Sequence, residues 1–269
     1  MQRDVIEIGG CEIVVERLGG GPPLVLLHGE AGPRNISTFI EKLGETFEVH
    51  APRLPGWSGT RRAPHVRTVR DVALVAQEYV EQFDRPVAMA GLSLGGWVAA
   101  ELASNAPKLV SALALVSPTG VKVGGREDRD FTDFYLLPEP ARTAVFYAPG
   151  RAPGLNLGDN TDVFLDKAVA DDAVVRYGWQ PFMHDPGLPA RLRRVKASAL
   201  ILSGDRDAFV LNPGYYEAYA MLIPGARHEV IAGGGHRLEE EQPETVAERI
   251  VKFIQTTKRP TYRRDRALA

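Results

Sequence analysis

A glycine-rich turn places one serine between an apolar run and a run of small residues. The stretch GLSLGG (91–96) follows VAMA and precedes WVAAELA, which predicts a buried strand that passes directly into a helix. In this G-x-S-x-G pattern, Gly91 and Gly95 leave room for a tight backbone, and Ser93 is presented at the carboxyl end of the strand. The pentapeptide alone is as consistent with chance as with catalysis. Its strand-to-helix context favours Ser93 as a nucleophile.

A serine hydroxyl needs a base, and the chain offers one downstream. The run SALILSGDRD (198–207) predicts a buried strand that ends in a polar turn with Asp205 and Asp207. His236 follows a triple-glycine loop after another apolar run. The order Ser93, aspartate, His236 is one of the known orders of a serine, acid and base triad.

With these motifs in place, the chain resembles the α/β-hydrolase family over most of its length. In that family a strand ending in His-Gly supplies part of the oxyanion hole, and PPLVLLHGEAG (22–32) is similar to this pattern. The resemblance implies that the backbone N–H groups of Glu30 and Leu94 receive the oxyanion and that His28 shapes the turn. It also favours Asp207 over Asp205 as the acid.

The predicted fold class is α/β. Short apolar runs separated by helical stretches predict a mostly parallel sheet with helices on both faces, and alternation on either side of Gly9-Gly10 predicts an antiparallel hairpin at the sheet edge. Residues 68–83 predict a helix that Thr68 caps.

The strand and helix alternation lapses between Thr119 and Val195, where prolines and aromatic residues gather. By resemblance, this insertion after the sixth strand is a helical cap that supplies much of the substrate pocket. The predicted division is a core over 1–120 and 196–258, a cap over 121–195 and a C-terminal tail over 259–269. The predicted substrate contacts are His28, Trp57, Phe134, Trp179 and His184.

Composition excludes several classes of protein. Charged residues make up 25% of the chain and the net charge is -2, so nothing indicates a nucleic-acid binder. The single cysteine, Cys11, excludes an internal disulfide, and no apolar run approaches the roughly 20 residues of a membrane helix. We expect a cytoplasmic protein with a small-molecule substrate, no metal and no cofactor; the sequence does not indicate an oligomeric state.

The serine at position 93 narrows the activities that the resemblance implies. Relatives that open epoxides or displace halide carry aspartate there, so hydrolysis of a carboxylic ester through an acyl-enzyme is the first expectation. The alternatives are hydrolysis of a carbon-carbon bond, as in the meta-cleavage-product hydrolases, and a ligand receptor built on the same fold. Those carbon-carbon hydrolases usually have Ser-Gly-Pro in the oxyanion loop, and HGEAGPRN departs from it at Glu30. A carboxylate is unfavourable beside a developing oxyanion, so the Glu30 side chain is expected to point away or to be paired.

Overall fold

The chain is built around one eight-stranded sheet with the order β1-β2-β4-β3-β5-β6-β7-β8. The computed structural model describes residues 1–153 and 161–257. From β3 to β8 the strands run parallel. The nearly unbroken apolar sequences of β3, β5, β6 and β7 are those of strands covered on both faces. The strands are β1 (Gln2–Ile8), β2 (Cys11–Leu18), β3 (Pro23–Leu27), β4 (Glu48–Pro52), β5 (Val87–Leu92), β6 (Val110–Val116), β7 (Ser198–Gly204) and β8 (Arg227–Ile231).

The antiparallel part of the sheet is the N-terminal hairpin. β1 pairs with β2 from Gln2–Arg17 to Ile8–Cys11, and β2 joins the rest of the sheet through β4. Gly9 and Gly10 connect the strands with φ of 56° and 69°, the backbone that a tight hairpin turn requires at both central positions. The predicted edge hairpin and the predicted α/β class are therefore confirmed.

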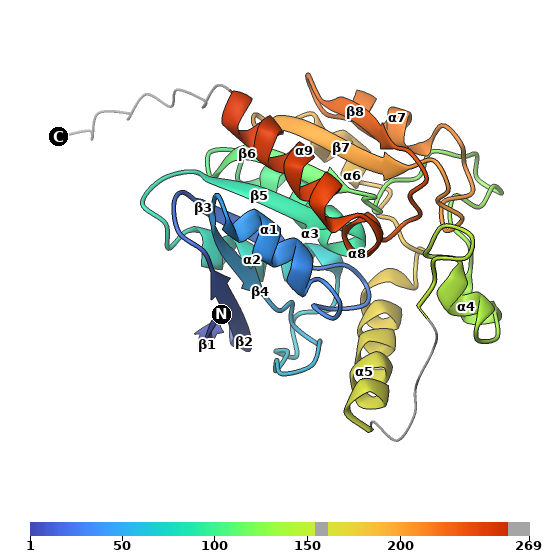
Figure 1. Cartoon of the computed structure of the whole chain (residues 1–269), viewed down its shortest axis with the longest axis horizontal. Coiled ribbons are helices and arrows are strands. Elements are labelled where there is room, and N and C mark those ends of the chain that lie inside the picture. Colours follow the sequence, from blue (N-terminus) through green and yellow to red (C-terminus); the bar gives the residue numbers. More distant parts are fainter. Residues whose placement is uncertain (154–160, 258–269) are drawn as a thin grey trace.

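Helices cover both faces of the sheet (Figure 1). One face carries α1 (Ser37–Gly44), α8 (Leu238–Glu241) and α9 (Pro243–Thr256), and the other carries α2 (Val69–Val80), α3 (Ser93–Asn105), α6 (Leu188–Leu192) and α7 (Tyr215–Leu222). Helix α2 begins where predicted, because the Thr68 hydroxyl accepts the Asp71 N–H and the Asp71 carboxylate accepts the Thr68 N–H. It ends at Val80, and the chain continues to Phe83 in turns.

The segment between β6 and β7 contains a 3-10 turn (Phe134–Leu136), α4 (Ala141–Ala144), α5 (Thr161–Gly178) and α6. Helices α4 and α5 stand beside the sheet at one end of the molecule (Figure 1). Helix α6 lies within the predicted cap range but packs its Leu188 and Leu192 into the core beside α3. The exact division into core, cap and tail stays a prediction, and the tail from 259 lies outside the described residues. Across residues 1–153 and 161–257, no helix is long and apolar enough to span a membrane.

Candidate active site

Ser93 occupies the sharp turn between β5 and α3. Its φ is 45°, a left-handed conformation that a side chain rarely adopts outside a constrained site. Gly91 and Gly95 make the turn possible: a Cβ on Gly91 would collide with the Gly95 carbonyl, and one on Gly95 would collide with the His28 carbonyl. The predicted strand-to-helix turn is therefore present, with Ser93 at its apex.

The structure brings Ser93, His236 and Asp207 into one line of hydrogen bonds. His236 Nε2 lies 2.9 Å from Ser93 Oγ, and His236 Nδ1 lies 2.8 Å from Asp207 Oδ2. Each residue follows the carboxyl end of a different parallel strand, β5, β7 or β8, and parallel strands bring those ends to the same edge of a sheet. In this arrangement His236 can accept the Ser93 proton while Asp207 holds the ring.

Asp207 is fixed by more than His236. Its Oδ1 accepts the N–H groups of Phe209 and Val210, and its Oδ2 also accepts the Tyr216 hydroxyl at 2.6 Å. Burial opposes ionisation of Asp207, but the charge of His236 and the hydrogen bonds from His236 and Tyr216 outweigh it and lower the Asp207 pKa. The alternative acid, Asp205, instead accepts the Gly233 N–H and lies partly in solvent.

Aromatic rings and a loop from the cap segment enclose His236. The Phe209 and Phe146 rings lie 4.7 Å and 5.8 Å from the imidazole, centroid to centroid. The Phe146 carbonyl accepts the N–H groups of His236 and Arg237, both at 3.0 Å. The base is thus buried and held in place by the segment between β6 and β7.

The predicted oxyanion loop passes directly beside Ser93. A Cβ added to Gly29 would lie 3.4 Å from Ser93 Cβ, so the backbone at this point approaches the nucleophile closely. The His28 ring fixes the loop through two hydrogen bonds, both of 2.9 Å: its Nε2 accepts the Leu54 N–H, and its Nδ1 donates to the Gly29 carbonyl. Burial lowers the His28 pKa to about 4, so the ring is neutral near pH 7.

Trp57 and His28 support the loop and do not line the cavity between the oxyanion loop, α4 and α5. The Trp57 ring is 1% exposed, and its Nε1 donates to the Glu30 carbonyl at 3.1 Å. It packs edge-on against His28 at 5.1 Å and stacks on Tyr177 at 5.9 Å. The predicted substrate contacts of Trp57 and His28 are therefore wrong, because both side chains are buried beneath the oxyanion loop. A glycine-proline loop beside the site can turn a ring such as that of Trp57 into the protein interior.

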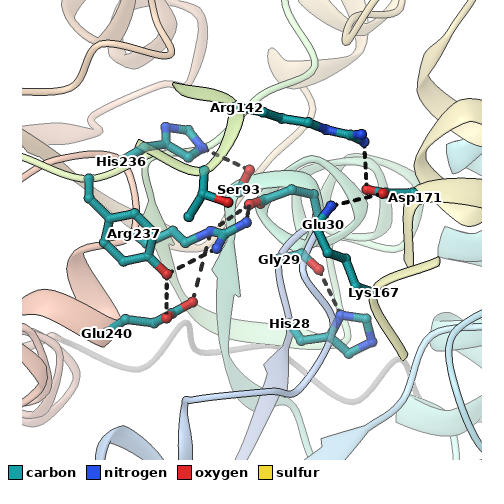
Figure 2. Close-up of polar contacts among 12 residues, drawn as sticks. His28, Gly29, Glu30, Ser93, Arg142, Lys167, Asp171, His236, Arg237 and Glu240 are labelled. Atoms are coloured by element: carbon teal, nitrogen blue, oxygen red, sulfur yellow. Dashed lines mark hydrogen bonds and ion pairs between the residues drawn. The ribbon is translucent and has the colours of Figure 1, made fainter. Parts of the chain in front are cut away.

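A cavity of about 300 Å³ opens between the oxyanion loop, α4 and α5. Phe134, a predicted substrate contact, lies on its wall, together with Phe146, Val163 and Val174. Charged residues on the wall are largely paired with one another: Arg142 and Lys167 contact Asp171 at 2.9 Å and 3.0 Å (Figure 2). The cavity therefore offers a substrate rings and aliphatic groups beside ion pairs.

Trp179 and His184 lie elsewhere. Both line a separate hollow of about 270 Å³ whose wall includes Phe131 and Phe182. Trp179 is 46% exposed, and His184 Nδ1 lies 2.9 Å from the Phe182 carbonyl. Their predicted contact with the substrate is not supported by these positions, because neither lies on the wall of the cavity that Glu30 and Phe134 line.

Arg237 is a residue of the site for which the sequence predicted no role. Arg237 Nε donates a hydrogen bond to one oxygen of Glu30 at 2.9 Å, and Arg237 Nη2 forms an ion pair with the same oxygen at 2.8 Å. The expected pairing of the Glu30 carboxylate is therefore present, with a partner that the sequence did not identify. The one sequence feature that could have indicated a role for Arg237 is its position immediately after His236.

The described part of the chain holds no group of three or more His, Cys, Asp or Glu side chains placed to bind a metal ion. The site is instead a set of hydrogen-bonded side chains and backbone groups.

Known proteins resemble this chain in both sequence and fold. The model of the alpha/beta hydrolase family matches residues 24–249. A pimeloyl-[acyl-carrier protein] methyl ester esterase from Nitrosomonas europaea is 32% identical over 84% of this chain and 93% of its own length. Carboxylesterase YbfK from Bacillus subtilis is 25% identical over 83% of this chain and 82% of its own.

Among solved structures, a bacterial membrane phospholipase A superposes with a TM-score of 0.77 at 21% identity. The similarity covers 95% of this chain and 87% of that one, and it shows a shared fold. The family predicted from the motifs is confirmed: the chain belongs to the α/β-hydrolase family.

Proposed function

We propose that this α/β-hydrolase is a carboxylesterase that cleaves esters of mainly apolar small molecules through an acyl-enzyme on Ser93. The observation that carries the proposal is the line of hydrogen bonds from Ser93 through His236 to Asp207. Glu30 of the oxyanion loop and Arg237, which follows His236 in the chain, line a cavity next to it. The similarity to named esterases supports ester bonds as the substrate class.

The proposed reaction begins when Ser93 Oγ attacks the ester carbonyl and His236 Nε2 takes its proton. Negative charge then develops on the carbonyl oxygen, which the backbone N–H groups of Glu30 and Leu94 receive. His236 returns the proton to the leaving alcohol as the carbon-oxygen bond breaks. Water activated by His236 releases the acid, and Asp207 stabilises the charged imidazole in both halves of the reaction.

The cavity supports the choice of an apolar substrate. Its charged groups largely satisfy one another, so Phe134, Phe146, Val163 and Val174 remain as surface for an acyl or alcohol group. Arg142 is additionally covered by the Tyr135 ring, whose centroid lies 4.5 Å from the guanidinium carbon. An uncharged chain entering the cavity would bury apolar surface, worth about 25 cal/mol per Å².

The test is steady-state hydrolysis of a chromogenic ester series, from acetyl to long acyl chains, by wild-type protein and by Ser93→Ala. We expect turnover with a chain-length optimum in the wild type and a loss of about 10⁴-fold or more in the variant. Wild-type melting behaviour in Ser93→Ala serves as the control for folding. Equal turnover by both proteins would contradict the proposal.

A wild-type protein that reacts with a serine-directed fluorophosphonate but hydrolyses no ester would shift the assignment. In that case Ser93 is reactive and the substrate class is wrong, and a carbon-carbon bond beside a ketone becomes the substrate to test next.

A further inference from the structure

Glu30 joins three residues in a buried group that the proposed reaction does not use. Arg237 bonds to Glu30 and donates from Nη1 to the Tyr147 hydroxyl at 3.0 Å, and that hydroxyl donates to Glu240 at 2.7 Å. We call Glu30, Arg237, Tyr147 and Glu240 the Arg237 cluster. Glu30 belongs to the oxyanion loop, Arg237 to the loop that carries His236, Tyr147 to the cap segment and Glu240 to α8. Figure 2 shows Glu30, Arg237 and Glu240 beside one another.

The cluster compensates the buried negative charge of Glu30. This side chain is 5% exposed and belongs to the residue whose N–H is the proposed oxyanion donor. An unpaired carboxylate there would repel the negative charge that forms on the substrate, and little water is present to screen it. A buried charge that loses its partner is also strongly unfavourable by itself.

Arg237 supplies the compensating charge in a fixed orientation. Its guanidinium carbon lies 4.6 Å from the centroid of the Phe146 ring, and its Nη1 is occupied by Tyr147. Burial opposes ionisation of Glu30, but the charge of Arg237, together with the charge of His236 and a hydrogen bond from Ser93, outweighs it and lowers the Glu30 pKa. The pair is therefore ionised near neutral pH, with Arg237 Nε and Nη2 at 2.9 Å and 2.8 Å from one Glu30 oxygen.

The same residue connects the oxyanion loop to the base. Arg237 follows His236 in the chain, and its backbone N–H shares the Phe146 carbonyl with that of His236. Pairing with Glu30 thus links the loop that receives the oxyanion to the loop that carries the general base. A shift of Arg237 would move both loops relative to Ser93.

We propose that Arg237 is a positioning residue for the reaction at Ser93, which neutralises the Glu30 carboxylate and holds the oxyanion loop against the base loop. The inference rests on the proposed function where the test uses an ester substrate. The labelling of Ser93 tests it without an ester. It predicts that removing the cation alone damages the reaction more than removing both charges of the pair. A residue that only packs would show no such rescue.

The experiment compares Arg237→Met, Glu30→Gln, Arg237→Lys and the double variant Glu30→Gln with Arg237→Met. The measured quantities are kcat and KM for the best ester and the rate constant for labelling by a fluorophosphonate. In that labelling, fluoride leaves phosphorus as Ser93 Oγ bonds to it and the Ser93 proton passes to His236. Labelling therefore reports on the Ser93 site even where no ester is hydrolysed.

We expect Arg237→Met to lower kcat and the labelling rate by about 100-fold with a smaller change in KM, as for loss of an oxyanion contact. The double variant should recover at least about tenfold of that loss, and Arg237→Lys should be faster than Arg237→Met because it keeps the charge. A double variant as slow as Arg237→Met, or an Arg237→Met protein as fast as wild type, would overturn the proposal.

Two controls separate this effect from general destabilisation. Arg191→Met removes another mostly buried arginine, which bonds to Glu101 between α6 and α3, away from Ser93. It should lower the melting temperature without changing the labelling rate. If Arg237→Met does not fold, Arg237→Gln takes its place in the same comparison with and without Glu30→Gln. Failure of the proposed ester activity is distinguished by wild-type labelling without ester turnover.

Discussion

The site has two halves, the triad at the strand ends (the core half) and the cavity next to it (the cavity half), and they hold their side chains in different ways. Ser93, His236 and Asp207 stand at strand ends of the core, each fixed by short hydrogen bonds and, at His236, by the Phe146 and Phe209 rings. The cavity beside them is walled mainly by α4, α5 and their neighbouring loops, with ion pairs such as Arg142–Asp171. From this difference we predict that core residues govern the rate of the proposed reaction and that cavity residues govern the choice of substrate.

The largest expected effect tests the core half. Asp207→Asn keeps the shape of the side chain but removes the charge that stabilises the protonated His236, so kcat should fall about 10⁴-fold. The measurement is single-substrate kinetics with the best ester. Asp205→Asn is the matched control, since the Asp205 carboxylate accepts the Gly233 N–H and lies partly in solvent, and the kcat of this variant should stay within about threefold of wild type. Equal losses in both variants would remove the distinction between the two aspartates.

The sequence could predict the core half because each part of it is local. The glycines around Ser93 indicate the sharp turn. Parallel strands bring their carboxyl ends to one edge of the sheet, so Asp207 and His236 could be proposed from their positions after strands. The residues alone left Asp205 as an alternative acid, and the resemblance to the family favoured Asp207. The Tyr216 hydroxyl and the N–H groups of Phe209 and Val210, which orient Asp207, come from three-dimensional packing.

The cavity half was less predictable for a physical reason. Glu30 and Arg237 are far apart in the chain, and only the fold brings their side chains to 2.8 Å. Trp57 and Phe134 both look like pocket aromatics in the sequence, but one ring supports the oxyanion loop and the other lines the cavity. The direction of each ring depends on how the cap segment packs against the core, and a short sequence motif does not determine that packing.

The next effect concerns the stability of the oxyanion loop. The His28 pKa is about 4 in the folded protein and 6.5 without burial, so the unfolded chain binds a proton in this window and the folded protein does not. The contribution of His28 to the free energy of unfolding is therefore intact above pH 6.5 and is lost as the pH falls towards 4. The loss amounts to about 3 kcal/mol by pH 4.

Urea unfolding at several pH values between 7 and 4.5 measures this contribution. His28→Gln should be less stable than wild type at pH 7, because it replaces the ring that bonds to Leu54 and Gly29, but its stability should fall less steeply with acid. His65→Gln, a change at an exposed histidine, should keep the wild-type slope. If His28→Gln follows the wild-type slope, the ring is not the buried neutral group described here.

The smallest expected effect tests the cavity half and the claim that it selects the substrate. Phe134 is 3% exposed, lines the cavity and packs against Phe146 with ring centroids 5.1 Å apart. Phe134→Ala should lower kcat/KM for long acyl esters by about tenfold, mostly through KM, and should affect acetyl esters much less. Trp179→Ala removes an exposed ring outside this cavity and should leave the chain-length profile within about twofold of wild type. An equal loss for every ester in Phe134→Ala would mean that the ring supports His236 through Phe146 and not the substrate, and the separation of the two halves would fail at this residue.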